Sequence, residues 1–318
     1  MRHLRFAVLV PLLLTGCAEK PQTLLAPDDL ALQMILWNMS PWTEATDAPF
    51  VGVNTPVATE GCPFVTRSEH ALVFASNRAG GHGALDLYIS YWDAAAKQWG
   101  TPVNLGPKIN TAANEQCPLL SQNGKELIFV SNRPGGAGGL DLWVAHRHDN
   151  RSDLEWETAV NLATVNSLVD EFGPGWYEEN GRTVLYFNSN RAGGAGGHDL
   201  YVSHQTSDGT FAAPVPAAGL NTQFQEQFAS LSKDGLEIFF SSDRPGTLGG
   251  LDLWHATGER TSDPWGTPAN LGPAVNSLAA EGRSAISWDG MTLYFHSTRK
   301  GSVDLFQTTR TPSSGWRN

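Results

Sequence analysis

The chain contains the segment Ser131-Asn132-Arg133-Pro134-Gly135-Gly136-Ala137-Gly138-Gly139-Leu140-Asp141-Leu142-Trp143, and related segments follow the same plan in four other places. A glutamate precedes each copy, and these glutamates recur at intervals of 55 or 56 residues: Glu60, Glu115, Glu171, Glu226 and Glu281. A fixed internal repeat of this kind is the sequence signature of propellers and other repeat architectures. The repeat therefore limits the possible folds to repeat architectures before any single motif is considered.

Each repeat divides into pieces of strand length. In four repeats an Asn-Gly or Asp-Gly pair, such as Asn123-Gly124, marks a hairpin turn. A short apolar run follows, for example Leu127-Ile128-Phe129, and it is too short for a helix. The glycine-rich hairpin and an outer aromatic residue complete the unit. Four short antiparallel strands per repeat predict an all-β, five-bladed β-propeller of four-stranded antiparallel blades over residues 42–318.

The fifth repeat lacks the Pro-x-Asn-Leu-Gly and Asn-Ser/Thr portion that the others contain. Asn54-Thr55, near the start of the array, parallels Asn110-Thr111 of a complete repeat. We therefore expect the N-terminal segment to close the last blade, with the segment around Asn54 lying against the strand near Trp316.

Composition limits the classes of function. The 318 residues carry a net charge of −11, and only 17% are charged, while Gly numbers 33 and Pro 19. An acidic chain of this kind is a poor nucleic-acid binder, so no nucleic-acid partner is expected. Because the repeats occupy nearly the whole length, any activity is expected on the array itself. We expect a monomer.

The first residues are typical of export. Arg2 and Arg5 precede an apolar run that ends at Leu14, as in a signal peptide. Leu14-Thr15-Gly16-Cys17 resembles the bacterial lipobox, which implies cleavage after residue 16 and lipidation of Cys17. Residues 17–41 are then a leader or tether that could contain a short helix. The expected location is the outer membrane of a bacterial cell envelope, facing the periplasm, with the membrane contacted through the lipid.

The glycine-rich motif resembles the WD-like β-propeller repeats of the TolB-like family. The likeness rests on Ser-Asn-Arg-x-Gly-Gly-x-Gly-Gly-x-Asp-Leu-Tyr/Trp, present at 76–88, 131–143 and 189–201 and shortened in the last two repeats. It covers nearly all of residues 42–318. The resemblance implies a propeller of an envelope protein.

Two residue types flank the hairpin in every repeat, and we interpret them as structural Arg/Asp pairs that hold the strand ends. They are Arg78 with Asp86, Arg133 with Asp141, Arg191 with Asp199, Arg244 with Asp252, and Arg299 with Asp304. The hairpin also resembles a calcium-binding nonapeptide motif, but its copies lie too far apart for a tandem array. No cofactor is predicted, a bound cation at the channel mouth is possible, and the metal ligands are unknown.

The repeat glutamates precede the innermost strands and are our candidates for ligand binding at the channel mouth. The competing interpretation is that each one makes hydrogen bonds that close its blade. Cys62 and Cys117 both fall two residues after such a glutamate, so they occupy equivalent places in neighbouring repeats. Two buried free thiols are the preferred interpretation, and a disulfide across two blades is the alternative.

The predicted function is a lipid-anchored scaffold that binds an envelope protein or a glycan without catalysis. The alternative is a glycosidase-like, glycan-active enzyme that uses carboxylates at the channel mouth. Equivalent glutamates give no distinction between an acid and a base, which such catalysis needs. Four tryptophans outside the blade pattern are candidates for a recognition surface: Trp37, Trp92, Trp176 and Trp288.

Overall fold

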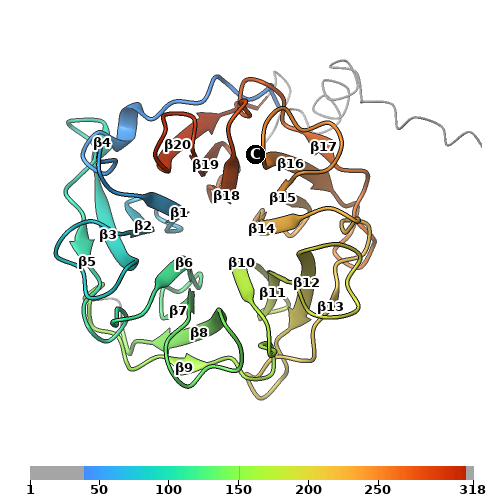
Figure 1. Cartoon of the computed structure of the whole chain (residues 1–318), viewed down its shortest axis with the longest axis horizontal. Coiled ribbons are helices and arrows are strands. Elements are labelled where there is room, and N and C mark those ends of the chain that lie inside the picture. Colours follow the sequence, from blue (N-terminus) through green and yellow to red (C-terminus); the bar gives the residue numbers. More distant parts are fainter. Residues whose placement is uncertain (1–38, 150, 313–318) are drawn as a thin grey trace, which may run out of the picture.

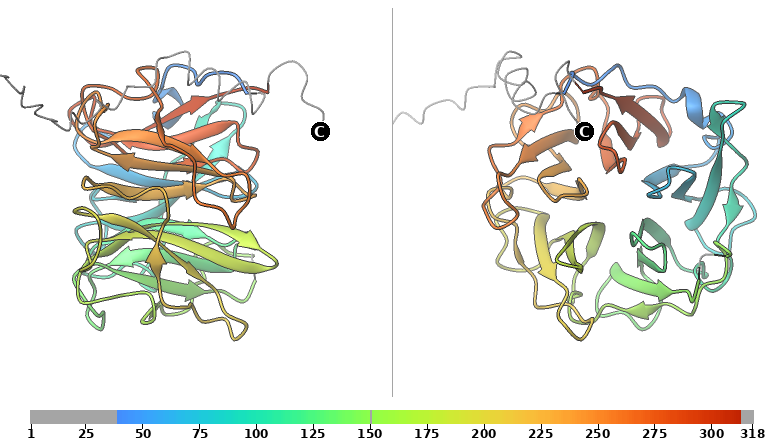
Figure 2. Two further views of the ribbon diagram at one scale, coloured as in Figure 1. Left: turned by 90° about the vertical axis from the view of Figure 1, so that its right-hand side faces the viewer. Right: turned by 180° about the vertical axis from the view of Figure 1, so that it is seen from behind.

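The computed structural model describes residues 39–149 and 151–312, and this part of the chain forms five antiparallel sheets around one axis (Figure 1). Each sheet is a blade whose strands run outward from the axis in chain order. Seen from the side, the blades pack face to face around the ring (Figure 2). The predicted five-bladed β-propeller is confirmed.

The first three blades show the pattern that the repeats predict. Blade 1 contains β1 (Glu60–Val65), β2 (Ala71–Ser76), β3 (Asp86–Asp93), β4 (Gln98–Trp99) and β5 (Val103–Asn104). Blade 2 contains β6 (Glu115–Leu120), β7 (Glu126–Ser131), β8 (Asp141–His146) and β9 (Val160–Asn161). Blade 3 contains β10 (Glu171–Glu179), β11 (Arg182–Ser189), β12 (Asp199–His204) and β13 (Val215–Pro216). In every one the repeat glutamate begins the innermost strand.

The last two blades continue the same order. Blade 4 contains β14 (Glu226–Leu231), β15 (Glu237–Ser242), β16 (Asp252–Thr257) and β17 (Ala269–Asn270). Blade 5 contains β18 (Glu281–Ile286), β19 (Thr292–Ser297) and β20 (Asp304–Thr309). The short η1 (Ala48–Phe50) is a 3-10 helix. No helix in the described residues is long and apolar enough to cross a membrane.

The N-terminal segment supplies the outer edge of blade 5. Thr46 pairs with Gln307 of β20 in an antiparallel bridge, and Met39 pairs with Pro312. Asn54 accepts a hydrogen bond from the Leu305 amide at 2.9 Å and donates to its carbonyl at 3.0 Å. Asn110 makes the same two bonds with Leu87 in blade 1. The expected closure is therefore present, although Trp316 lies outside the described residues.

The core lies between the blades. The second strand of each blade places a phenylalanine two residues before its last serine, and these rings are fully buried: Phe74, Phe129, Phe187, Phe240 and Phe295. Alternating residues of a strand point to opposite faces, so each such strand is apolar on both faces where it lies between two neighbouring blades. Packing of these buried strands against the neighbouring blades holds the ring together. It also positions the turns on the two faces of the ring.

Candidate functional site

The repeat glutamates are buried and fully engaged. Glu115 accepts hydrogen bonds from the Ser131 hydroxyl at 2.9 Å and from both the amide and the hydroxyl of Thr111 at 2.8 Å. All five glutamates have no exposed surface. Burial raises the pKa of Glu60, against the lowering effect of the Thr55 amide and of Arg78. The prediction that these glutamates bind a ligand at the channel mouth is wrong, because their oxygens accept hydrogen bonds that join each blade to the preceding loop. The five glutamates are Glu60, Glu115, Glu171, Glu226 and Glu281.

The hairpin arginines pair with these glutamates. Arg133 lies 3.1 Å from Glu115 and donates to the Ile109 carbonyl at 2.5 Å. Its guanidinium also lies over the rings of Phe129 and Trp143, 4.8 and 5.3 Å from their centres. Such contacts add a cation–π attraction to the ion pair. The same Arg–Glu pair recurs in every blade: Arg78–Glu60, Arg133–Glu115, Arg191–Glu171, Arg244–Glu226 and Arg299–Glu281.

The expected Arg/Asp pairs are therefore wrong. Asp141 instead accepts hydrogen bonds from the amides of Ala137 and Gly138 in its own hairpin, at 2.5 and 3.2 Å. Asn161 donates a further bond to it at 3.2 Å. The glycine-rich loop folds back over the start of the third strand, so the Asp141 carboxylate contacts the loop amides and not an arginine. Comparable bonds hold Asp86, Asp199 and Asp252, whereas Asp304 accepts from Ser302.

The centre of the ring is closed by the residues two positions after each repeat glutamate. They are Cys62, Cys117, Gly173, Phe228 and Arg283, and all five have positive φ, between 38° and 63°. The register of each innermost strand shifts at this point, which marks a β-bulge. The bulge turns the side chains of the other four residues toward the axis, and Gly173 contributes only its backbone. We call this set the axial plug.

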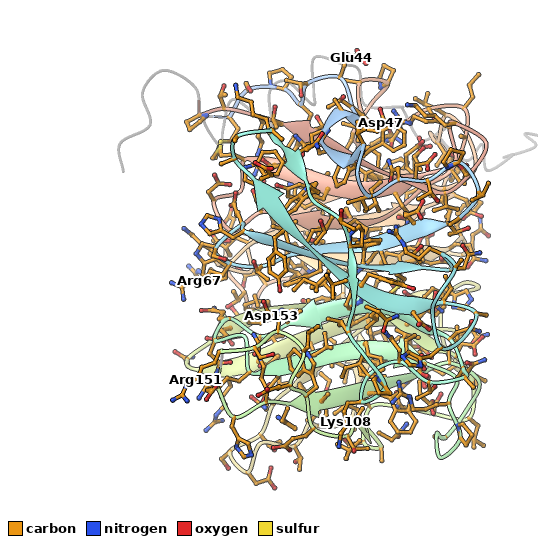
Figure 3. The ribbon with its side chains drawn as sticks, turned by 90° about the vertical axis from the view of Figure 1, so that its left-hand side faces the viewer. Glu44, Asp47, Arg67, Lys108, Arg151 and Asp153 are labelled. Carbon is orange, nitrogen blue, oxygen red and sulfur yellow. A yellow bond between two sulfur atoms is a disulfide. The ribbon has the colours of Figure 1, made fainter. Side chains whose placement is uncertain are left out.

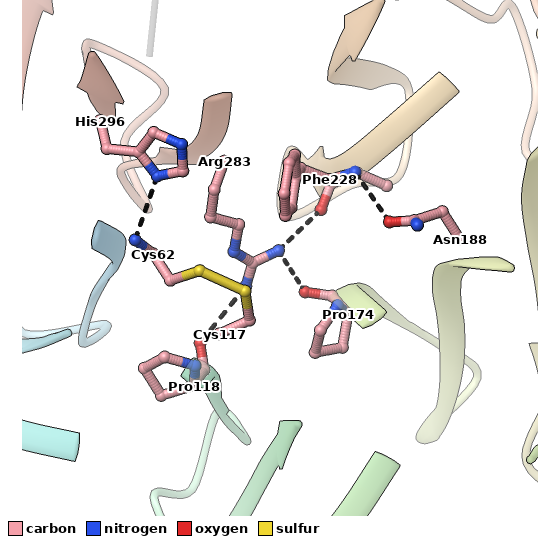
Figure 4. Close-up of a disulfide and its surroundings, with 9 residues drawn as sticks. Cys62, Cys117, Pro118, Pro174, Asn188, Phe228, Arg283 and His296 are labelled. Atoms are coloured by element: carbon pink, nitrogen blue, oxygen red, sulfur yellow. Dashed lines mark hydrogen bonds between the residues drawn. A yellow bond between two sulfur atoms is a disulfide. The ribbon is translucent and has the colours of Figure 1, made fainter. Parts of the chain in front are cut away.

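A disulfide joins two members of the axial plug. Cys62 and Cys117 are bonded, with their Cα atoms 4.7 Å apart, so blades 1 and 2 are linked covalently at the axis (Figure 4). The preferred expectation of two free thiols is wrong. Equivalent bulges in neighbouring blades bring the two β-carbons together, which a count along the sequence does not show.

Arg283 extends from blade 5 into the centre of the axial plug, where its guanidinium lies beside the disulfide (Figure 4). Its guanidinium donates to the carbonyls of Pro174 at 2.5 Å and of Ala229 and Pro118 at 3.3 Å (Figure 4). No carboxylate in the described residues forms an ion pair with it. Burial lowers the pKa of Arg283 to about 9. Carbonyl oxygens from three blades thus take the place of a counterion.

A second set of equivalent positions surrounds one mouth of the channel. Counting seven residues from each repeat glutamate gives five different side chains: Arg67, Gln122, Glu178, Lys233 and Trp288. We call these five the mouth ring. Four of them, with Trp176 and neighbouring residues, line a shallow hollow of about 60 Å³ at the ends of the innermost strands. The five side chains differ in charge, polarity and size, so this mouth is asymmetric although the repeat glutamates and the hairpin arginines are the same in every blade.

Polar groups of the mouth ring are unused. The side chains of Arg67, Gln122 and Lys233 have no hydrogen bond or ion pair with any described residue. Arg67 lies over the ring of Trp288 with its guanidinium carbon 4.7 Å from the centroid. It also extends outward at the same end of the molecule as Arg151 (Figure 3). Hydrogen-bond donors beside an aromatic ring suit a ligand that has both polar groups and an apolar face.

Two carboxylates at this end occupy unlike environments. Burial raises the pKa of Glu178, which Arg67 lowers and Glu126 raises further. The Glu178 side chain makes no hydrogen bond within the described chain, whereas Glu126 lies 3.7 Å from His146 Nδ1. Glu69 also has a raised pKa from burial and from Asp289, but it accepts a hydrogen bond from the Asp289 amide. Glu178 therefore combines a raised pKa with a side chain that has no hydrogen-bond partner among the described residues.

Sequence reasoning missed the mouth ring, because it compared the repeats for what they share. The same count from each glutamate would have found the ring as the place where five copies differ. Trp176 and Trp288 were named as candidates for recognition, and both line the hollow. Trp92 packs against Trp99 at 5.2 Å between ring centres. Trp37 and the predicted lipidation site Cys17 lie outside the described residues. Within the described residues, no group of three potential metal ligands occurs.

No protein-family model and no curated protein matches the chain. Solved structures do. A thermostable family-43 glycoside hydrolase is 14% identical with a TM-score of 0.56, over 81% of this chain and 90% of that one. An α-L-arabinofuranosidase from Lactobacillus brevis is 11% identical with a TM-score of 0.55, over 83% and 93%. TolB from Acinetobacter baumannii is 12% identical with a TM-score of 0.52, over 90% and 69%.

These likenesses show the fold, and they correct one expectation. We expected a binding scaffold without catalysis, and that prediction is wrong: glycan-cleaving enzymes recur among the similar structures, which favours the glycosidase-like alternative. The repeat glutamates named for that alternative are not its carboxylates, because they are buried in ion pairs.

Proposed function

We propose that the protein is a glycan-active, glycosidase-like enzyme whose site is the mouth of the propeller channel. The carrying observation is that the mouth ring holds five different side chains at five equivalent positions, with Glu178 next to a second carboxylate, Glu126. Glycoside hydrolysis needs two carboxyl groups in different states, one protonated and one ionised. Glu178 and Glu126 have unlike surroundings, whereas the repeat glutamates are equivalent.

In this proposal Glu178 is the general acid. Burial raises its pKa, and in its protonated form the carboxyl gives its proton to the oxygen of the leaving sugar. Glu126 is the second carboxylate, which either activates water or attacks the sugar. Trp176 and Trp288 offer ring faces against which the apolar face of a sugar can pack. A hollow of about 60 Å³ admits the end of a glycan chain and not a buried oligosaccharide.

The experiment compares two glutamates at the same end of the ring. Purified full chain is screened with aryl glycosides and short oligosaccharides, and then Glu178→Gln and Glu69→Gln are assayed on the best substrate. We expect Glu178→Gln to lower kcat/KM by about 100-fold or more, as loss of a general acid does. Glu69→Gln is the matched control, because its raised-pKa carboxyl is held by the Asp289 amide.

Melting curves of both variants keep the comparison free of folding effects. Full activity of Glu178→Gln, or equal losses in the two variants, contradicts the assignment of Glu178. The absence of cleavage across the whole substrate panel contradicts the proposed function.

We further propose that the chain carries the WD-like, TolB-like repeat and is exported as an outer-membrane lipoprotein. The repeated Ser-Asn-Arg and Gly-Gly-x-Gly-Gly motif supports the first part. The lipobox-like Leu14-Thr15-Gly16-Cys17 supports the second. A lipid on Cys17 and a periplasmic orientation would place the channel mouth among envelope glycans, which are its proposed partners.

A further inference from the structure

Two cations stand at the mouth of an otherwise acidic protein. Arg67 and Lys233 belong to the mouth ring and line its hollow, while the chain as a whole carries a net charge of −11. Neither side chain forms an ion pair with a described residue. The five hairpin arginines and Arg310, by contrast, are all paired with glutamates. The hollow is therefore lined by two positively charged side chains and by no carboxylate.

The charge balance of the mouth ring favours an anion. Arg67 and Lys233 both line the hollow, whereas no carboxylate is among its lining residues. Gln122 adds an unused amide donor between the two cations in ring order. A planar guanidinium matches the two oxygens of a carboxylate, and an ammonium adds a second point of charge. The hollow, at about 60 Å³, fits a carboxylate and one edge of a sugar ring.

Arg67 is positioned for this task by Trp288. The guanidinium lies over the indole at 4.7 Å, which orders the arginine without using its hydrogen-bond donors. A sugar that packs on the neighbouring Trp176 face would present its substituents to Arg67 and Lys233. We infer that the mouth ring binds a glycan bearing a carboxylate, a uronic-acid chain, through Arg67 and Lys233. This inference rests on the proposed function, since it names the substrate class of the same site.

The test uses two sugars that differ in one group. Trigalacturonate and α-1,4-linked galactotriose share their ring stereochemistry, and the first has a carboxylate where the second has a hydroxymethyl group. Titration calorimetry with the full chain measures binding of each, and product analysis of the same mixtures records any cleavage. We expect trigalacturonate to bind at least about tenfold more tightly at low salt, and the preference to shrink at about 0.5 M NaCl.

The variants are matched for charge. Arg67→Gln with Lys233→Gln should abolish the preference for the acidic sugar. Lys108→Gln with Arg151→Gln removes the same charge from two exposed residues outside the hollow and should keep the preference. Melting curves verify that both double variants fold, and the neutral trisaccharide reports whether the Trp176 surface is intact.

The outcomes separate this inference from the proposed function. Preference for trigalacturonate that depends on Arg67 and Lys233, without cleavage of any sugar, supports the inference and contradicts the enzyme. Cleavage of the neutral sugar with no preference for trigalacturonate supports the enzyme and overturns the inference, and tighter binding of the neutral sugar than of trigalacturonate also overturns the inference. The inference is also overturned if trigalacturonate does not bind, or if both double variants lose the preference equally.

Discussion

His296 is a neutral base held against the axial plug. Its Nδ1 accepts a hydrogen bond from the Cys62 amide at 3.3 Å, which only the unprotonated nitrogen can do. Burial and the nearby charge of Arg283 lower its pKa to about 4. An imidazole with a lowered pKa binds its proton more readily in the unfolded chain. Its contribution to stability is therefore present near neutral pH and is lost as the pH falls from about 6.5 toward 4.

We predict that this loss disappears in His296→Leu. Between pH 7 and pH 4, wild type should lose about 2 kcal/mol more of its free energy of unfolding than the variant does. This is less than a fully enclosed imidazole would give, because His296 is partly exposed. Urea unfolding at several pH values measures this difference, with the exposed His82→Asn as control. Parallel pH profiles for wild type and His296→Leu would refute the assignment.

At the scale of one blade, the repeat glutamate ties three elements together. Glu226 accepts from Thr222 of the preceding loop at 2.6 Å, from Ser242 at the end of β15 at 3.1 Å, and from Arg244 of the hairpin at 2.9 Å. Arg244 is itself buried against Phe240, 4.9 Å from the ring centre. Removing one partner of a buried ion pair leaves the other charge uncompensated, which is the costly part.

Glu226→Gln should therefore lower the free energy of unfolding by about 3 kcal/mol, because Arg244 loses its counterion. Denaturant unfolding measures the loss, and Glu259→Gln, at an exposed site, is the control. Cleavage and sugar binding by the folded variant should match wild type, since Glu226 does not reach the mouth. A stable Glu226→Gln that loses sugar binding would return the repeat glutamates to the ligand site.

Part of the structure of each blade was predictable from the sequence, and part was not. Strand order, hairpin turns and closure through Asn54 follow from patterns that repeat, and the structure bears them out. The partner of Arg133 was not predictable, because Glu115 and Asp141 recur with equal regularity and only the path of the hairpin distinguishes them. The mouth ring lay in the positions where the repeats disagree, and comparison of the repeats for likeness passes over such positions.

At the scale of the whole ring, closure depends on contacts between distant parts of the chain. Arg310 follows β20 and donates two hydrogen bonds to Glu237 of blade 4, at 2.9 and 2.6 Å. It also bonds the Gly290 carbonyl at 2.8 Å and lies over Trp42 of the N-terminal segment, 4.7 Å from the ring centre. One side chain thus joins blade 4, blade 5 and the segment that completes blade 5.

Arg310→Met tests whether this contact holds the ring closed. Burial alone would raise the pKa of Glu237, but hydrogen bonds from His255 and Arg310 outweigh it and lower the pKa to about 2. A carboxylate with a lowered pKa stabilises the fold above about pH 4.5, and this contribution is lost as the pH falls toward 2. The variant should lose about 3 kcal/mol at neutral pH and show a smaller further loss on acidification than wild type.

The double variant Arg310→Met with Glu237→Met removes both charges and should recover part of that stability, because no buried charge is left without its partner. Amide hydrogen exchange locates the effect: Thr43 and Thr46 donate to β20 across the closure and should exchange faster in Arg310→Met, while the β7 amides of blade 2 keep their protection. Uniform loss of protection around the ring would mean that Arg310 stabilises the propeller generally and that the N-terminal segment does not need it to stay in place.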